Sequence, residues 1–310
     1  MISPEKLDDL VWGGTFPEIE KSAISVPVEL TAGCPNFIKY GKIDDKMFND
    51  ANESSDFKAL MEWANTIKPI IESSPGFSLL KISDVELSND QLKSLYYAIS
   101  RGLGKLNNRY GELFEVKDRN LDYKKEAVPV SKTNASTGFH TDSTSAQYSP
   151  DIVGLLCLQP GKTGGESIIS NAANLYQWLE TKHPEFIELL CQNIIRDVIT
   201  PGSKTDIETI KSNSFPIFSD QTGVFKFRYM RYWILSGHER CNMEISENLI
   251  SAMDAIDDFF HHKENQLTYF MERGDILFIN NNFICHSRTE YKDHEEVSKK
   301  RTLVRTWINI

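Results

Sequence analysis

The chain has few of the features that hold a secreted scaffold together or anchor a protein in a membrane. Its 310 residues contain five cysteines, an odd number, and none of them are spaced as Cys-x-x-Cys. This pattern excludes a regular disulfide framework and predicts no zinc site. No apolar run reaches the roughly 18 residues that span a bilayer, and the N-terminus has no basic, apolar leader. We therefore expect a cytoplasmic protein that does not act in a membrane.

Positive charge is also scarce. The 34 Lys and Arg residues are outnumbered by 44 Asp and Glu residues, the formal net charge is −10 at pH 7, and the basic residues form no block. Because nucleic-acid binding depends on clustered positive charge, this composition disfavours a nucleic-acid partner. The hydrophobic content of 40% is enough for one sizeable core, and we find no repeat or linker. The sequence predicts a single domain over residues 1–310.

The seven histidines are few but informative. His140-Thr141-Asp142 is followed far downstream by His286. A His-x-Asp/Glu triplet is expected about once by chance in such a composition, so the triplet alone carries little weight. His183-Pro184-Glu185 also fits, but Pro184 is typical of the first position of a helix. His294-Glu295-Glu296 fits too, but it lies in a charged stretch and is typical of a solvated loop.

The surroundings of His140 and His286 distinguish this pair. The apolar run Ile152 to Leu158 predicts a buried strand, Gly164-Gly165-Glu166-Ser167 predicts a turn and a short strand, and Gly274 to Asn280 predicts a turn and strand just before His286. Two imidazoles and one carboxylate, with other positions left open, suit a non-heme Fe(II) centre. Either histidine taken alone is more typical of a hydrogen-bonded structural residue. Cys285 we expect to be a small buried thiol rather than a metal ligand.

The C-terminal segment adds an arginine in an apolar setting. Thr302 to Ile308 alternates like a strand and places Leu303, Arg305 and Trp307 on one face. The planar guanidinium of Arg305 matches a carboxylate with two parallel hydrogen bonds. We interpret Arg305 as an inward residue that binds an anion; a surface arginine is the alternative.

Over Gly138 to Leu179 and Gly274 to Ile310, with a fainter echo at Gly76 to Leu80, the chain resembles the TauD/TfdA (taurine dioxygenase-like) family of Fe(II)/2-oxoglutarate-dependent oxygenases. Sequence pattern alone predicts only a mixed α and β fold. The resemblance implies a double-stranded β-helix, or jelly-roll, core buttressed by helices. It also implies the residue roles: His140, Asp142 and His286 as iron ligands, Ser167 as a hydroxyl that bonds the co-substrate, Arg305 as the clamp on its distal carboxylate, and Arg301 as a supporting residue. For Ser167 an ordinary strand hydroxyl is the alternative.

The resemblance further implies Fe(II), 2-oxoglutarate and O2 as the requirements of the reaction, with release of succinate and CO2. Hydroxylation is the expected outcome, and desaturation or oxidative rearrangement is the alternative. The substrate is expected to be a small molecule such as an amino acid or a natural-product precursor. A zinc hydrolase would use the same triad but would have no use for Arg305 and Ser167. A non-catalytic binding module of this fold would be expected to have lost a ligand or the arginine.

Other segments carry secondary predictions. We predict helices over 58–71, 172–182, 184–191 and 247–260, and another that begins at a capping box at Ser88 and runs to about Leu103. The irregular segment 115–137 is a candidate active-site lid or, equally, a passive loop. The aromatic run 225–233 predicts a strand, with Arg228 and Arg231 on opposite faces. We hypothesise that one of these two arginines receives a substrate carboxylate.

Overall fold

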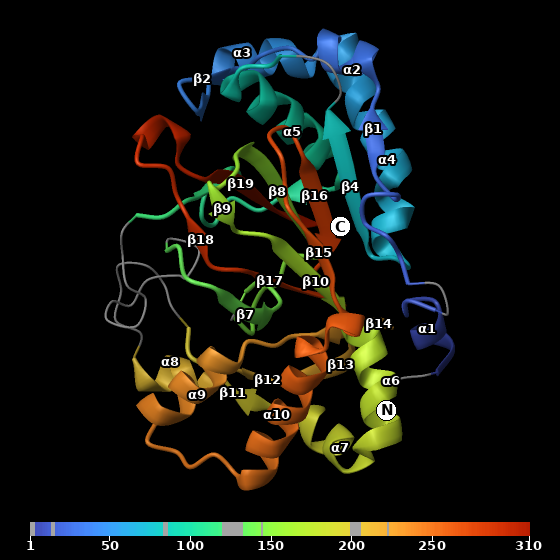
Figure 1. Cartoon of the computed structure of the whole chain (residues 1–310), viewed down its shortest axis with the longest axis vertical. Coiled ribbons are helices and arrows are strands. Elements are labelled where there is room, and N and C mark those ends of the chain that lie inside the picture. Colours follow the sequence, from blue (N-terminus) through green and yellow to red (C-terminus); the bar gives the residue numbers. More distant parts are fainter. Residues whose placement is uncertain are drawn as a thin grey trace.

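The computed structural model describes residues 4–13, 16–82, 86–119, 133–143, 145–198, 206–221 and 223–310. Most of the described secondary structure belongs to two β-sheets and the helices around them (Figure 1). The α-helices are α1 (Pro4–Asp8), α2 (Val28–Gly33), α3 (Asp45–Asn52), α4 (Ser55–Glu72), α5 (Asn89–Leu103), α6 (Ala172–Lys182), α7 (Ile187–Leu190), α8 (Ile207–Ser212), α9 (Arg231–Arg240) and α10 (Glu247–His261).

The larger sheet has seven strands in the order β1-β4-β16-β8-β19-β5, with β6 also paired to β19. The smaller sheet has four strands in the order β15-β10-β17-β7. The strands of the larger sheet are β1 (Ile24–Val26), β4 (Phe77–Ile82), β5 (Lys105–Leu106), β6 (Phe114–Val116), β8 (Ile152–Gln159), β16 (Ile276–Asn280) and β19 (Thr302–Asn309). Those of the smaller sheet are β7 (Thr137–His140), β10 (Ser167–Asn171), β15 (Leu267–Tyr269) and β17 (Ile284–Arg288).

Four short two-stranded pairs lie outside these sheets. They are formed by β2 (Ile38–Lys39) with β3 (Lys42–Ile43), β9 (Thr163–Gly164) with β18 (Tyr291–Lys292), β11 (Ile194–Ile195) with β12 (Ser214–Phe215), and β13 (Phe218–Gln221) with β14 (Val224–Phe227). The pairing of β9 with β18 matters for the site, because it fixes the Gly164-Gly165 turn against Tyr291.

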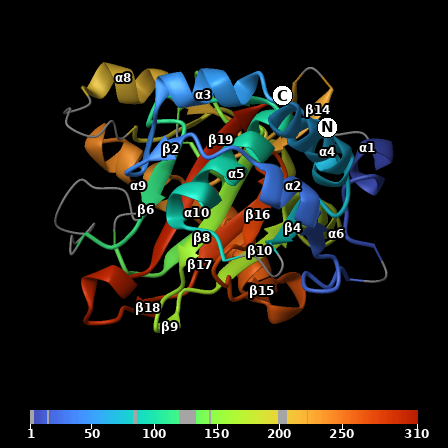
Figure 2. The ribbon, with the colours of Figure 1, turned by 90° about the horizontal axis from the view of Figure 1, so that it is seen from above.

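The apolar run of β8 lies in the middle of the larger sheet, where it pairs antiparallel with β16 on one side and with β19 on the other. Both faces of β8 are covered, as the continuous hydrophobic sequence predicts. On the outer face, Leu156, Phe278 and Val304 join a core cluster with apolar residues of α4 and α5. Seen from above, α5 crosses in front of these strands (Figure 2). This layer fixes the larger sheet as a rigid wall for the site.

The sequence predictions for these two helices are confirmed. Ser54 caps α4 by accepting a hydrogen bond from the Phe57 N–H. At the start of α5, Ser88 and Gln91 form the complete capping box, with each side chain bonded to the other residue's backbone N–H. Gly102 and Gly104 are required at the end of α5 for space, because an added Cβ would lie 2.4 Å from the Met61 carbonyl oxygen or 2.5 Å from that of Asn309.

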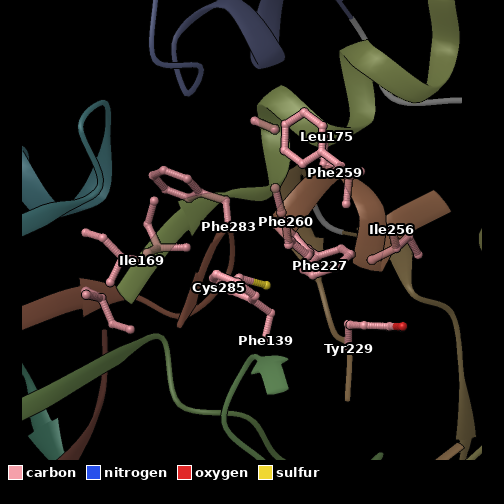
Figure 3. Packing of buried hydrophobic residues seen from close by; sticks show 14 of the residues in the cluster. Phe139, Ile169, Leu175, Phe227, Tyr229, Ile256, Phe259, Phe260, Phe283 and Cys285 are labelled. Atoms are coloured by element: carbon pink, nitrogen blue, oxygen red, sulfur yellow. The ribbon is translucent and has the colours of Figure 1, made fainter. Parts of the chain in front are cut away.

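The smaller sheet is covered by the second helical layer, which includes α6 and α10. Phe139 of β7 stacks on Phe260 of α10 with ring centroids 5.1 Å apart, and Cys285 of β17 is fully buried in the same cluster (Figure 3). Figure 3 shows the Cys285 sulfur among these aromatic rings. The expectation that Cys285 is a buried thiol is therefore confirmed, and the alternation of β17 sends the next residue, His286, to the opposite face.

Two predictions of secondary structure need correction. The segment 225–233 is not one strand: β14 ends at Phe227, and α9 begins at Arg231. The predicted helix 184–191 is divided into a 3-10 turn over Pro184–Phe186 and the short helix α7. The helices predicted at 58–71, 172–182 and 247–260 correspond to α4, α6 and α10. Most of the predicted lid, residues 120–132, lies outside the described residues.

None of the helices in the described part of the chain combines the length and the apolar character that crossing a membrane requires.

Candidate metal centre and cavity

Three side chains predicted from the sequence as metal ligands converge at one point. His140 ends β7 and lies directly opposite His286 of β17 in the antiparallel ladder, so their rings are neighbours with centroids 4.2 Å apart. Asp142 follows two residues after His140, and its Oδ1 lies 3.7 Å from Nε2 of each histidine. One ligand atom from each residue lies within 4.8 Å of the others. This spacing suits a single metal ion held between them.

The protonation states also suit a metal. Burial lowers the pKa of His140 below its ordinary value. Burial and the neighbouring imidazole of His140 lower the pKa of His286 to about 3. Burial opposes ionisation of Asp142, but the Arg305 guanidinium and both histidines outweigh it and set the Asp142 pKa at about 2. At neutral pH the site therefore offers two neutral imidazoles and one carboxylate, the state in which these groups bind a metal.

The backbone around the ligands is held by hydrogen bonds from distant segments. The side-chain amide of Asn281, in the turn between β16 and β17, accepts from the Asp142 N–H at 2.7 Å and donates to the Asp142 carbonyl at 3.1 Å. Thr141 is paired with Tyr229: its N–H donates to the Tyr229 carbonyl, and its hydroxyl accepts from the Tyr229 N–H. On His140, Nδ1 lies 2.8 Å from the Gly138 carbonyl, which leaves Nε2 for a metal.

A cavity of about 210 Å³ opens beside the triad and is lined from both sheets. The larger sheet contributes inward residues of β8, β16 and β19, and the smaller sheet contributes residues of β7, β10 and β17. The prediction that one face of the terminal strand points inward is confirmed, since Leu303, Arg305 and Trp307 all line the cavity. Ser167 at the start of β10 lines it as well and is 7% exposed.

Arg305 lies beside the metal site. Its Nη1 is 3.2 Å from Oδ2 of Asp142, and its guanidinium lies over the rings of Phe114 and Trp307, at 5.1 and 4.8 Å from their centroids. The indole N–H of Trp307 donates to the same Oδ2 at 2.6 Å. The two oxygens of Asp142 thus face different partners: Oδ1 faces the histidines, and Oδ2 faces Arg305 and Trp307.

Arg301 lies elsewhere on the cavity wall and is only 3% exposed. Its Nη2 donates to the Gly165 carbonyl at 3.2 Å, and its guanidinium lies 4.9 Å from the centroid of the Tyr291 ring. Its Nη1 is buried and has no hydrogen-bond partner among the described residues. The Gly-Gly turn makes this placement possible, because a Cβ on Gly165 would lie 2.9 Å from Nε of Arg301, and both glycines have positive φ.

The structure adds two residues that the sequence reasoning missed, Arg288 and Asn281, and a contact with Asp142 that it did not foresee for Trp307. Arg288 lines the cavity and is 9% exposed, and its guanidinium lies 4.9 Å from the centroid of the Tyr291 ring, which Arg301 also contacts. Alternation along β17 would have found it, because residues 286 and 288 share a face. Asn281 and Trp307 touch Asp142 across long sequence separations, and no local pattern marks them.

The two arginines proposed from the aromatic run have other partners. Arg228 donates to the carbonyls of Ser143 and Ser145 and stacks on Phe215. Arg231 forms ion pairs of 2.7 and 2.8 Å with Asp254 and Asp257 of α10. Neither is among the described residues that line the cavity. The premise that the two guanidiniums project from opposite faces of one strand is wrong, because a helix begins at Arg231.

Known proteins resemble this chain in sequence and in fold. It is 29% identical over 182 residues to FR-33289 synthase of Streptomyces rubellomurinus, which covers 58% of this chain and 51% of that protein. It is 23% identical over 193 residues to human gamma-butyrobetaine dioxygenase, with 61% and 48% covered. The chain therefore spans about half the length of the curated relatives it matches.

Among solved structures, asparagine oxygenase in complex with Fe(II), 2S,3S-3-hydroxyasparagine and succinate superposes with a TM-score of 0.65 at 15% identity and covers 93% of both chains. The non-heme iron oxygenase OrfP in complex with Fe and alpha-ketoglutaric acid gives a TM-score of 0.58 at 15% identity, with 93% of both chains covered. These likenesses establish a shared fold. The family model for taurine catabolism dioxygenase TauD, TfdA family matches residues 48–307, and the chain belongs to that family.

Proposed function

We propose that this protein is an Fe(II)- and 2-oxoglutarate-dependent oxygenase that hydroxylates a small anionic molecule. The observation that carries the proposal is the convergence of His140, Asp142 and His286 at a cavity whose wall also holds buried arginines. Family membership supports it. When bound, Fe(II) with 2-oxoglutarate and O2 would supply the oxidation of a C–H bond and the release of succinate and CO2.

We propose a double-stranded β-helix as the architecture, within a single domain of residues 1–310. The path of the chain supports the barrel: β7 lies in the smaller sheet, β8 in the larger, β10 and β15 in the smaller, β16 in the larger, β17 in the smaller and β19 in the larger. Strands that are consecutive in sequence thus pass back and forth between the two sheets that flank the cavity. The strands β7 and β17, which carry the proposed ligands His140 and His286, are neighbours at one edge of the smaller sheet.

The donor set fits Fe(II). Two neutral imidazoles and one carboxylate are the facial set of non-heme iron oxygenases, and they leave positions free for a chelating co-substrate and O2. In this chain His140, Asp142 and His286 would hold the metal. Their protonation requires no rearrangement at neutral pH, because both histidine pKa values are lowered and Asp142 stays ionised.

For the distal carboxylate of 2-oxoglutarate we propose Arg301, in place of Arg305, which the family resemblance implied. Arg305 contacts the candidate metal carboxylate itself, so it lies at the end of the cavity where the co-substrate would chelate the metal. Arg301 lies four residues earlier in the chain, about 13 Å away in extended backbone, and has a buried donor, Nη1, without a partner among the described residues. A bound carboxylate would satisfy that donor. Ser167 remains the proposed hydroxyl partner of the co-substrate.

The charge of the cavity supports an anionic substrate. Its described lining includes Arg288, Arg301 and Arg305, against the single carboxylate of Asp142. A divalent metal would add two positive charges and 2-oxoglutarate two negative ones, which leaves a net positive cavity that attracts an anion. Arg305, next to the metal, is the proposed partner of a substrate carboxylate. The amino-acid ligands named for asparagine oxygenase and OrfP each carry a carboxylate, the group that Arg305 is proposed to bind.

An anaerobic titration of the protein with Fe(II) and then 2-oxoglutarate tests the proposal without knowledge of the substrate. We expect a weak visible charge-transfer band when the co-substrate chelates the metal. A zinc hydrolase would bind metal but give no such band on addition of 2-oxoglutarate, and a non-catalytic module would bind neither. Either result would overturn the proposed function.

A further inference from the structure

Trp307 contacts the candidate metal centre although it is neither a proposed metal ligand nor a proposed partner of the co-substrate. Its indole Nε1 donates to Oδ2 of Asp142 at 2.6 Å, and both side chains are buried, with exposures of 9% and 5%. The other oxygen, Oδ1, faces Nε2 of both histidines at 3.7 Å. A carboxylate is able to bind a metal through one oxygen or through both. Here the two oxygens are already divided between different neighbours.

The Trp307 ring has little freedom to leave this position. The edge of Tyr110 packs against it with centroids 5.3 Å apart and an interplanar angle of 80°. Its backbone is fixed in β19, opposite Val153 of β8, and its carbonyl accepts a hydrogen bond from the Asn107 N–H. On the cavity side the Arg305 guanidinium lies over the ring. The donor is therefore held by backbone, core and cation together.

We propose that Trp307 is a positioning residue that restricts Asp142 to a single metal-facing oxygen. The inference rests on the proposed function, since it concerns how the metal would be held. The physical reason is that an oxygen engaged by a short N–H bond and a guanidinium has its lone pairs occupied, so only Oδ1 remains for a metal. One oxygen from Asp142 keeps a further coordination position open, and such a position is what a chelating co-substrate requires.

Arg305 contacts the same oxygen, but the two donors differ in permanence. An arginine that also meets a substrate carboxylate would share its donors when the substrate binds. The indole N–H of Trp307 is a single donor already directed at Oδ2, so its bond to Asp142 persists through binding. Trp307 is therefore the donor whose removal isolates the positioning effect.

The test uses Co(II) as the probe, because its visible absorption reports coordination number and needs no turnover. Trp307→Phe retains an aromatic ring but loses the donor. We expect its Co(II) spectrum to change in intensity and shape and the Co(II) affinity to fall about 10- to 100-fold, the usual effect of losing an outer-shell partner. The matched control is Trp178→Phe, since Trp178 of α6 packs against Phe259 and is not among the described residues that line the cavity. It should leave both readings unchanged.

Replacement of Trp307 by 3-benzothienylalanine gives a second route if Trp307→Phe does not fold, because sulfur replaces the N–H in a ring of nearly the same shape. Trp307→His, which restores a ring donor, should recover part of the wild-type spectrum. A purely structural role would lower the unfolding temperature of the metal-free protein and leave the Co(II) spectrum of the folded fraction unchanged, and that result would overturn the inference. Wild-type protein that takes up Co(II) but not 2-oxoglutarate would overturn the proposed function alone.

Discussion

The two ends of the cavity are built differently. At the metal end Asp142 has partners on every side: Asn281 bonds its backbone N–H and carbonyl, and Trp307 and Arg305 bond its Oδ2. At the Tyr291 end, Arg301 has a buried Nη1 and Arg288 a buried Nε with no hydrogen-bond partner among the described residues. Buried donors without partners are costly in a folded protein.

This difference indicates that one end of the cavity binds the metal and the other binds the co-substrate. At the metal end the hydrogen bonds of Asp142 are in place before any metal arrives, although the buried Nδ1 of His286 has no hydrogen-bond partner among the described residues. At the Tyr291 end each guanidinium donates to backbone carbonyls through Nη2 and keeps one buried donor without a partner among the described residues, and both guanidiniums lie 4.9 Å from the centroid of the Tyr291 ring. Substitutions at the metal end should therefore damage metal binding, and substitutions at the other end should damage co-substrate binding. The predictions below test that separation, from the largest expected effect to the smallest.

The largest effect is expected from the ligands. His140→Ala, Asp142→Ala and His286→Ala should each abolish stoichiometric Fe(II) binding and all 2-oxoglutarate turnover, because the remaining two ligands hold the metal too weakly. Iron content after gel filtration and succinate formation are the measurements. His183→Ala is the control, since His183 belongs to a competing His-x-Glu triplet at a helix start and its pair with Glu185 is exposed. Full iron content in two of the three ligand variants would contradict the assignment.

The next effect concerns the Tyr291 end. Arg301→Ala should raise the KM for 2-oxoglutarate by a factor that corresponds to about 2–5 kcal/mol, because it leaves a carboxylate unpaired in a buried site. Fe(II) affinity without co-substrate should stay at the wild-type value, which distinguishes this end from the metal end. Thermal unfolding of the metal-free variant checks that the fold survives.

Arg305→Ala is the matched comparison. It removes one of the two partners of Oδ2 of Asp142, so we expect weaker metal binding and a smaller rise in the KM for 2-oxoglutarate than in Arg301→Ala. If the order of the two KM values is reversed, Arg305 binds the distal carboxylate, as the family resemblance implied, and the two ends of the cavity exchange their roles.

A smaller effect is expected from the turn that holds Asp142. Asn281→Ala leaves the buried Asp142 N–H without its acceptor and should lower the free energy of unfolding by about 1–3 kcal/mol. Fe(II) affinity should fall as well, because the ligand backbone is released. The control is Asn309→Ala. It removes one hydrogen bond from the Asn309 side-chain amide to the Ser149 carbonyl and does not affect a proposed metal ligand. Equal Fe(II) affinities in both variants would show that Asn281 supports only the fold.

The sequence pattern and the family resemblance together pointed to His140, Asp142 and His286, which the structure brings within 4.8 Å of one another. His140 and Asp142 are two residues apart, and His286 follows a strand that its apolar run makes recognisable. The inward face of β19 was likewise predicted from alternation alone. The contacts of Trp307 and Asn281 with Asp142 were not predicted, because they span 165 and 139 residues and depend on how the two sheets are placed. The sequence could not distinguish Arg301 from Arg305 either, because both line the cavity. Only the assembled structure shows that Arg305 lies beside Asp142 of the candidate metal centre.

The prediction of a strand over residues 225–233 was wrong for a different reason. Its aromatic residues predicted a strand as far as Trp233, but Phe227 and Tyr229 are in the core against α10, and the chain turns into a helix at Arg231. The ion pairs of Arg231 with Asp254 and Asp257 link the start of α9 to α10. Asp254 and Asp257 lie in α10, which follows later in the chain, so the residue pattern within 225–233 could not predict these ion pairs.

This segment gives the smallest expected effect. Arg231→Leu removes partly exposed ion pairs with Asp254 and Asp257 and should cost at most about 1 kcal/mol of unfolding free energy, with Fe(II), 2-oxoglutarate and substrate binding unchanged. Arg228→Leu should do more, because it frees the carbonyls of Ser143 and Ser145 in the loop that follows Asp142. Chemical denaturation and binding of an identified substrate are the measurements. A fall of orders of magnitude in substrate affinity for Arg231→Leu, at unchanged stability, would place that guanidinium in the site after all, and the source of positive charge at the metal end would then have to include α9.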